Sequence, residues 1–377
     1  MRGSLVRVAT VAATVLLTLP AAAPARGAEE VRADWYFGAM SAAQAQRLAK
    51  GDGVTIAVID TGVDADHPDL RGRVLPGATV DRTGVVDPAK PGDVDLSGHG
   101  TAMAGLIAGI GSGDGAPLGV APLAEILPVR VTRGEDGTLD PENVYAGVRW
   151  AIGQGAKVVS LSLSGKPTGD APWKKQLIEH AIAHDVVLVA AAGNRSELEV
   201  RVGEPASIPG VVAVSGLARD GSVWSGSVTG GPVVLSAPAE DLPHLTAEGG
   251  CERGSGTSGA AALVAGVAGL IRSRYPDASA ADVVNRLIRT AHDEGSPGRD
   301  PGFGFGAVNA YEALAATLAP SDHYPLDVPE ELVAEPALPV PEGPGAGAWL
   351  LAAAALLAAG SVVCVALHLR HRGPASR

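Results

Sequence analysis

Cysteine and positive charge are both scarce in this chain. Its 377 residues include two cysteines, Cys251 and Cys364, and 29 Lys plus Arg against 41 Asp plus Glu, a formal net charge of −12. Two cysteines exclude a disulfide framework, and because Cys364 lies inside an apolar stretch we do not expect it to meet Cys251. The acidic balance argues against a nucleic-acid partner, since binding to phosphates needs an excess of Lys and Arg.

Apolar residues are abundant and fall into short runs. They make up 46% of the chain, against 19% charged residues, and the length allows one large domain with additional segments. Between residues 51 and 318, apolar runs of strand length alternate with stretches of helical periodicity. This alternation predicts an α/β domain with a mainly parallel central sheet that helices cover on both faces.

The stretch Gly250–Leu270 combines a glycine-rich turn with a small-residue helical pattern. We expect a tight turn that leads into a buried helix, with Ser258 in its first turn. A hydroxyl there lies among unpaired backbone N–H groups and at the positive end of the helix dipole. This position suits a nucleophile whose attack creates an oxyanion.

Two known glycine motifs resemble parts of this stretch. Residues 254–259 match the dinucleotide-binding pattern G-x-G-x-x-G, but that pattern requires a preceding strand, and residues 244–253 are interpreted as a loop. The G-x-S-x-G elbow of α/β-hydrolases is missed, because Ala260 stands two positions after Ser258. A Ser258 that only caps a core helix stays the alternative unless the chain supplies a base and an acid.

Three further motifs supply these groups. An apolar run ends at Asp60 in D-T-G, His99 opens H-G-T in a Gly-flanked turn, and a second apolar run ends at Asn194 in A-A-G-N. With Ser258 in G-T-S, these motifs resemble those of the subtilisin-like serine peptidases, and the chain order Asp, His, Ser is the subtilisin order. The resemblance covers about Gly51 to Leu318.

The resemblance implies a three-layer sandwich fold and peptide-bond hydrolysis. Ser258 is then the nucleophile, His99 the general base, and Asp60 the group that orients His99. The Asn194 side-chain amide and the Ser258 N–H are expected to bind the oxyanion. This chemistry needs no metal and no cofactor.

The resemblance also implies where the substrate lies. An extended peptide is expected along the residues that follow one of the strands, Ser162, Leu163, Ser164 and Gly165, through backbone hydrogen bonds. Ser164 replaces the first glycine of the usual Leu-Gly-Gly. Gly259 follows the nucleophile where the family has Met or an aromatic residue, and Ala262 stands where Pro is usual. The change at Ser164 bears on the shape of the substrate pocket, whereas Gly259 and Ala262 do not touch the reacting atoms, so activity is expected.

Other polar clusters are assigned structural roles. His67 precedes a proline and lies close to Asp60 in sequence, which excludes it as the base. His180 and His184 are four residues apart on a helical pattern, but no acidic ligand motif is near them, so they are interpreted as ordinary histidines rather than a metal pair. Carboxylates at Asp64, Asp66 and Asp69 are interpreted as turn-capping groups rather than a calcium site.

Both ends of the chain carry signals for export and anchoring. Residues 1–25 are typical of a signal peptide, and residues 26–50 form an extension too short for a folded prodomain. Residues 319–347 are Pro-rich and acidic, typical of a stalk, and residues 348–369 are apolar over the length needed to cross a bilayer. The basic tail, 370–377, is expected in the cytoplasm, which places the peptidase domain outside the cell membrane.

This layout resembles the mycosins, the membrane-anchored subtilisin-like peptidases of actinobacterial type VII secretion. The resemblance implies a protein or peptide substrate and a secretion membrane complex as a partner. A catalytically silent partner in such a complex is the non-enzyme alternative. An aspartic peptidase is the alternative enzyme, but it needs two D-T-G loops and the chain has only Asp60-Thr61-Gly62.

Overall fold

The computed structural model describes residues 34–95, 97–112, 115–131, 139–196 and 199–328. The predicted signal peptide, residues 329–347 of the predicted stalk, the predicted transmembrane segment at 348–369 and the predicted tail at 370–377 lie outside these ranges, as does Cys364. None of the helices in the described ranges is both long and apolar enough to cross a membrane. The described residues belong to one unit that begins at Asp34.

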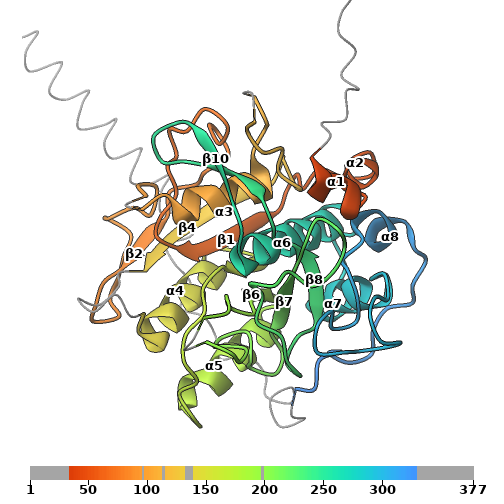
Figure 1. The fold of residues 1–377 in the computed structure, drawn as a ribbon. Helices are drawn as coiled ribbons and strands as arrows, with labels where there is room; N and C mark the ends of the chain where they lie inside the picture. Colours follow the sequence, from red (N-terminus) through yellow and green to blue (C-terminus); the bar gives the residue numbers. More distant parts are fainter. Residues whose placement is uncertain (1–33, 96, 113–114, 132–138, 197–198, 329–377) are drawn as a thin grey trace, which may run out of the picture. The chain divides into compact units, whose positions relative to one another are not determined.

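An eight-stranded sheet is the centre of this unit (Figure 1). Its strand order is β3-β2-β4-β1-β5-β6-β7-β8, and every neighbouring pair is parallel except β2 with β3. The mainly parallel α/β fold expected from the sequence is confirmed. The strands are β1 (Thr55–Asp60), β2 (Ala78–Val80), β3 (Val86–Asp87), β4 (Glu125–Val131), β5 (Val158–Leu161), β6 (Val187–Ala191), β7 (Val212–Leu217) and β8 (Leu235–Pro238).

Helices cover both faces of the sheet. Side chains alternate along a strand, and on β1 Ile56 lies against Gly269 of α6 whereas Ile59 lies against Gly147 of α4. Since these positions are three apart, α6 and α4 lie on opposite faces; α3 packs beside α6, and α5 beside α4. The helices are α1 (Trp35–Ala39), α2 (Ala42–Ala45), α3 (His99–Ala108), α4 (Pro141–Gly153), α5 (Pro172–Ala183), α6 (Thr257–Arg274), α7 (Ala280–Arg289) and α8 (Ala310–Ala315).

The central helix α6 is buried along most of its length, as its small-residue sequence predicts. A Cβ added at Gly269 would lie 2.6 Å from Ile56 Cδ1 on β1, and one added at Gly266 would lie 2.8 Å from Val120 Cβ. Glycine at these positions lets the helix approach the sheet and a neighbouring loop closely. The nucleophile candidate, Ser258, is the second residue of this rigid element.

Two segments interpreted as loops contain strands. Residues 77–96 include β2 and β3, which form the antiparallel edge of the sheet. Residues 244–253 belong to a hairpin of β9 (Leu242–Leu245) and β10 (Cys251–Gly254) that packs on α3. These strands have two to four residues each, too few to show a period in the sequence. Because β10 pairs only with β9 and antiparallel, the glycines after it do not lie in the βαβ unit that dinucleotide binding requires.

The N-terminal extension packs on the domain from Asp34 onward. Tyr36 and Met40 are fully buried, and the Tyr36 hydroxyl donates to the Leu118 carbonyl at 2.9 Å. The Trp35 indole donates to the Glu240 carbonyl at 3.1 Å. Residues 34–49 are therefore part of the folded unit rather than a free lead.

Candidate functional site

The site lies at the carboxyl edge of three neighbouring strands. β1, β5 and β6 are parallel neighbours, and they end at Asp60, Leu161 and Ala191. Residues that follow parallel neighbouring strands meet at one edge of the sheet, the usual place for a site in this architecture. Asp60 itself and the segments that contain Ser162 and Asn194 therefore come together.

The turn after β1 allows the start of α3 to approach Asp60. Gly62 has φ +106°, a conformation that favours glycine, and a Cβ there would lie 2.2 Å from the Val94 carbonyl oxygen. A Cβ at Gly100 would lie 1.9 Å from the Gly62 carbonyl oxygen and 3.2 Å from Asp60 Cβ. The glycines of D-T-G and H-G-T thus permit one backbone contact, and that contact brings His99 to Asp60.

Asp60 and His99 form a direct hydrogen bond. His99 Nδ1 lies 2.8 Å from Asp60 Oδ1, and the same oxygen accepts from the Thr61 N–H at 2.8 Å. The Asp60 side chain is 4% exposed, whereas that of His99 is 41% exposed. An ionised Asp60 only accepts hydrogen bonds, so His99 carries its proton on Nδ1 and Nε2 is left to accept one.

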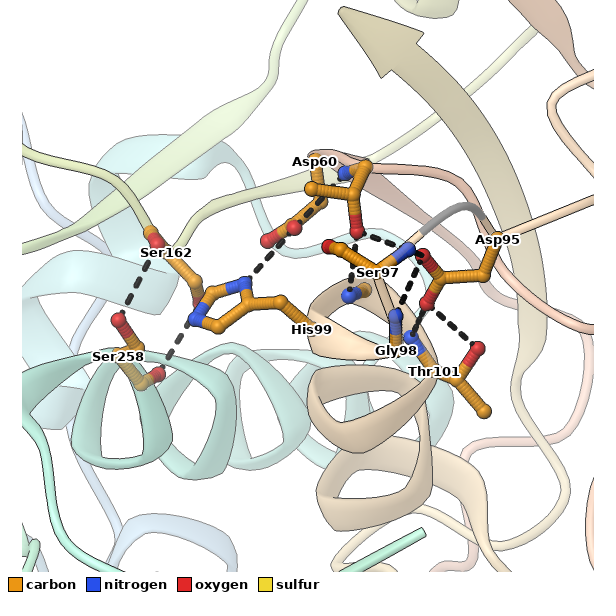
Figure 2. Close-up of polar contacts among 10 residues, drawn as sticks. Asp60, Asp95, Ser97, Gly98, His99, Thr101, Ser162 and Ser258 are labelled. Carbon is orange, nitrogen blue, oxygen red and sulfur yellow. Dashed lines mark hydrogen bonds and ion pairs between the residues drawn. The ribbon is translucent and has the colours of Figure 1, made fainter. Parts of the chain in front are cut away.

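Ser258 lies on the other side of the His99 ring from Asp60 (Figure 2). Its Oγ lies 3.1 Å from the Ser162 carbonyl oxygen, and the Ser162 hydroxyl donates in return to the Ser258 carbonyl at 3.0 Å. These two bonds tie the first turn of α6 to the segment after β5. The structure therefore brings together Asp60, His99 and Ser258, as the sequence motifs predict.

Thr257 fixes the orientation of the Asn194 side-chain amide. Asn194 Oδ1 lies 2.9 Å from the Thr257 N–H and 3.0 Å from the Thr257 hydroxyl, which itself accepts from the Gly193 N–H at 3.2 Å. A backbone N–H can only donate, so the atom it meets is the amide oxygen, and the NH₂ group points the other way. Asn194 also lines the cleft that contains His99 and Ser258.

The cleft contains most of the predicted site. Of the four residues expected to hold a peptide, Ser162, Leu163 and Ser164 line it. Gly165 is not among the lining residues, and its N–H and carbonyl both pair with the Glu204 backbone, at 2.8 and 2.9 Å. The lining is Thr61, Ser97, His99, Ser162, Leu163, Ser164, Ala191, Gly193, Asn194, Glu199, Thr257 and Ser258.

The unusual glycine after Ser258, the candidate nucleophile, has a packing reason. A Cβ added at Gly259 would lie 2.7 Å from Leu242 Cδ1 and 3.3 Å from Leu106 Cδ1. The side chain of Leu242, on β9, fills the space in which a residue at 259 would need to place its side chain. Gly259 is therefore matched to its surroundings in this chain.

Asp95 is part of this region and was missed from the sequence. It lies four residues before His99 and accepts hydrogen bonds from the first turn of α3 and from Thr61. Its position just before a Gly-flanked helix start was the available signal, since carboxylates favour helix N-termini. The Gly/Pro-containing sequence of residues 77–96 predicts one polar loop and does not single out Asp95.

The remaining candidates lie apart from the cleft lining. His67 is 2% exposed and bridges two loops, with Nδ1 accepting from the Asp69 N–H at 3.1 Å and Nε2 3.2 Å from the Gly250 carbonyl. Asp64 accepts from the Asp66 N–H at 3.0 Å, and Asp69 from the Ser112 N–H. Asp64 therefore caps its own turn, as the sequence interpretation has it, whereas Asp69 links two segments that are 43 residues apart.

The two helical histidines contact each other on α5. Their ring centroids are 4.2 Å apart, and His184 Nδ1 lies 2.9 Å from the His180 carbonyl. Burial and the neighbouring His184 lower the pKa of His180 to about 4. His180 is therefore neutral at physiological pH, and the contact is one of packing.

Comparison with known proteins assigns the family. The subtilase family model matches residues 51–306. Subtilisin DY of Bacillus licheniformis is 33% identical over 280 residues, which are 74% of this chain and 93% of the relative. Fervidolysin of Fervidobacterium pennivorans is 33% identical over 300 residues, which are 72% of this chain but only 42% of the relative, so the chain spans less than half of that protein.

Two solved structures agree with this assignment. The structure of fervidolysin, a keratinolytic enzyme related to subtilisin, aligns with a TM-score of 0.67 at 30% identity and covers 76% of this chain and 46% of that one. The structure of MycP1 with its N-terminal propeptide removed aligns with a TM-score of 0.65 at 27% identity, over 76% of this chain and 98% of that one. The chain belongs to the subtilase family of serine endopeptidases.

Proposed function

We propose that this chain hydrolyses peptide bonds by acyl transfer through Ser258, with His99 as general base and Asp60 as the group that orients His99. The main support is the 2.8 Å bond between His99 Nδ1 and Asp60 Oδ1, with Ser258 across the imidazole ring. With the carboxylate on Nδ1, Nε2 is the nitrogen that takes the hydroxyl proton.

The reaction proceeds in two halves. Ser258 Oγ attacks the scissile carbonyl while His99 Nε2 takes its proton, and Asp60 stabilises the imidazolium that results. The C–N bond then breaks as His99 returns the proton to the leaving amine, which leaves an ester on Ser258. Water, deprotonated by His99, attacks that ester and releases the acid, and Ser258 regains its proton.

The oxyanion is stabilised from two sides. The NH₂ of Asn194 points away from Thr257, and the N–H of Ser258 lies in the first turn of the 18-residue helix α6. Helix N-termini present unpaired N–H groups and a partial positive charge. Both donors are fixed before the substrate binds, which is what makes such stabilisation effective.

The substrate backbone is proposed to lie along Ser162, Leu163 and Ser164. These residues line the cleft beside Ser258, whereas the backbone groups of Gly165 already pair with Glu204. An extended peptide would add to this segment as a short strand. The bound segment is thereby one residue shorter than the Ser162–Gly165 segment expected from the sequence.

The direct test is hydrolysis of unstructured protein and peptide substrates by the wild type, Ser258→Ala and Ser255→Ala. Ser255 is a neighbouring serine whose hydroxyl accepts from the Asp241 N–H at 2.8 Å, outside the cleft lining, so it controls for loss of any nearby hydroxyl. We expect the Ser258→Ala enzyme to lose all but a residual rate and Ser255→Ala to retain activity. Equal activity of all three proteins would remove Ser258 from the mechanism.

We further propose that the peptidase is anchored outside the cell membrane by residues 348–369, with the tail 370–377 in the cytoplasm. Support comes from the apolar length of that segment and the arginines directly after it. A tag on the tail should be protected from external protease in intact cells. Cleavage of that tag would contradict this topology.

A role in type VII secretion is the most specific proposal. It is supported by the mycosin-like layout and by the alignment with MycP1 over 98% of that chain. Co-purification with secretion-channel components in detergent would support it, and a solitary monomer would count against it. If co-purification occurs but the wild type neither hydrolyses peptides nor reacts with fluorophosphonates, the silent structural partner becomes the better description.

A further inference from the structure

Asp95 joins the two segments that carry Asp60 and His99. We infer that Asp95 is a positioning residue of the proposed triad, which sets the distance between the turn after β1 and the first turn of α3. The inference rests on the proposed function for its catalytic consequence, but the geometry it describes can be measured without catalysis.

The Asp95 carboxylate accepts five hydrogen bonds from two directions (Figure 2). Oδ1 accepts from the Thr61 hydroxyl at 2.8 Å, the Ser97 N–H at 3.0 Å and the Gly98 N–H at 2.9 Å. Oδ2 accepts from the Thr101 N–H at 2.9 Å and the Thr101 hydroxyl at 2.7 Å. One carboxylate thus binds Gly98 and Thr101, which lie on either side of His99 in the chain, and also Thr61, the residue after Asp60.

Thr61 carries this connection to the catalytic pair. Its hydroxyl donates to Asp95 and accepts from the Gly100 N–H at 3.0 Å, while its N–H donates to Asp60 Oδ1 at 2.8 Å. Asp60 Oδ1 is the atom that bonds His99 Nδ1. Hydrogen bonds therefore connect Asp95 to Thr61, Thr61 to Asp60, and Asp60 to His99. The backbone at the start of α3 closes the loop, because Gly98 and Thr101 on either side of His99 donate to Asp95.

The ionised form of Asp95 is required for this arrangement. Burial raises the pKa of Asp95, but hydrogen bonds from Ser97, Thr101 and Thr61 outweigh it and hold the pKa below its usual value. Five donors point at the group, and an asparagine offers one acceptor oxygen and one NH₂. In either orientation of the asparagine, the NH₂ would face a backbone N–H. If the NH₂ takes the place of Oδ1, the bonds from Thr61, Ser97 and Gly98 are lost. If it takes the place of Oδ2, the bonds from Thr101 are lost.

The prediction for catalysis follows from geometry. Neither Asp95 oxygen touches Ser258 or the substrate segment, so loss of the link should misplace His99 without removing a binding contact. A displacement of about 1 Å at a reacting group costs on the order of 10²-fold in rate. We expect Asp95→Asn to lower kcat by about this factor per active site, with KM within about twofold.

Asp300→Asn is the matched control. Asp300 also accepts three backbone N–H bonds, from Gly302, Phe303 and Ser296, at 2.7, 2.9 and 3.1 Å, and it does not line the cleft. Its loss should lower stability without changing kcat per site counted by fluorophosphonate. A kcat per site for Asp95→Asn equal to that of Asp300→Asn would reduce Asp95 to a structural cap and overturn the inference.

Thr61→Val and Thr61→Ser distinguish loss of the Thr61–Asp95 hydrogen bond from a general loss of stability. Thr61→Val removes one of the five donors to Asp95 and the acceptor of the Gly100 N–H, but it leaves the four other donors to Asp95 in place. It therefore keeps the test valid if Asp95→Asn does not fold. We expect Thr61→Val to lower kcat as Asp95→Asn does, and Thr61→Ser, which keeps the hydroxyl, to have a kcat near that of the wild type. The double variant of Thr61→Val and Asp95→Asn should have a kcat no lower than that of the slower single variant. Additive losses would mean that Asp95 and Thr61 act separately, against the inference.

A spectroscopic measurement separates this inference from the proposed function. In the full-length Ser258→Ala protein, the downfield proton resonance of the His99 Nδ1–H bond should be present, and it should be lost or broadened on adding Asp95→Asn but not Asp300→Asn. If the wild type hydrolyses nothing yet this pattern holds, the proposed function fails and the positioning role stands. If hydrolysis is confirmed and the resonance is unchanged by Asp95→Asn, the positioning role fails alone.

Discussion

Changes at Asn194 separate oxyanion stabilisation from fold stability. Asn194→Leu removes the cleft-facing NH₂, but it also leaves the Thr257 N–H and hydroxyl without their acceptor, and Thr257 is 1% exposed. An unsatisfied buried donor costs about 1–3 kcal/mol of folding free energy. Asn194→Asp keeps an oxygen for both Thr257 donors and removes only the donor to the oxyanion, so the pair of variants distinguishes the two effects.

The expected size of the kinetic effect is large. Loss of one oxyanion donor costs about 2.7–4 kcal/mol, or 10²–10³ in kcat, the size found for the same change in subtilisin, a relative of this chain. Asn194→Asp should lose at least as much, since a carboxylate would repel the oxyanion. KM should stay nearly constant in both variants, because the lost interaction forms only in the transition state.

The assay is steady-state hydrolysis of a peptide p-nitroanilide, with active sites counted and unfolding followed by denaturant. Thr257→Val serves as the graded control, because it removes the hydroxyl bond to Asn194 and the acceptor of the Gly193 N–H but keeps the backbone bond to Asn194. It should lower the free energy of unfolding by about 0.5–1.5 kcal/mol for the bond to Asn194 and lower kcat by less than the Asn194 variants do. A kcat within about threefold of wild type for both Asn194 variants would refute the assignment of Asn194.

Three further predictions concern specificity, stability and pH. Ser164→Gly should raise kcat/KM for peptides with large P1 side chains relative to alanine, since the Ser164 hydroxyl lies 3.0 Å from where a Cβ on Gly193 would stand, beside the cleft. Tyr36→Ala should lower the free energy of unfolding by about 3–5 kcal/mol, because a fully buried ring and its bond to Leu118 are lost. His180→Gln should reduce the loss of stability between pH 6.5 and 4, because the unfolded chain takes up a proton there that the folded state, with a pKa of about 4, does not.

Each of these has a contradicting result. If Ser164→Gly leaves the ratio of kcat/KM for large P1 side chains to kcat/KM for alanine unchanged, Ser164 does not limit the size of the cleft. Cleavage of residues 34–49 from the folded protein without a change in unfolding would show that Tyr36 anchors nothing. Identical pH profiles of denaturant midpoint for wild type and His180→Gln would exclude a proton linkage at His180.

The fold was predictable where the sequence has long periodic runs. The run that ends at Asp60 is apolar throughout, and β1 is buried at all positions after Thr55. The small-residue pattern after Ser258 became α6, which is buried on all sides. Short elements were not predictable: β2 and β3 have three and two residues, and β8 (Leu235–Pro238) has four, so pairing with neighbours rather than local pattern makes them strands.

The site was predictable to the extent that each residue sits in a glycine-marked turn. Asp60, His99, Asn194 and Ser258 all lie within two residues of glycines, and this leaves a sequence signal. Gly62 and Gly100 allow close backbone approach, whereas Gly193 has φ +108° and Gly259 leaves room for Leu242. Asp95 accepts hydrogen bonds from backbone groups, as any carboxylate placed before a helix can, so its sequence position gives no distinctive signal. The pairing of Gly165 with Glu204 joins residues 39 apart, and the space that Leu242 takes beside Gly259 depends on the β9–β10 hairpin. Such tertiary contacts have no local signature.

Mapping the fluorophosphonate adduct is the most direct test of the central proposal. The full-length wild type is treated with a fluorophosphonate, digested and analysed by tandem mass spectrometry. A single adduct on Ser258, formed much more slowly in His99→Ala, is the predicted result. An adduct on another residue, or an equal rate on Ser258 without the His99 imidazole, would contradict it.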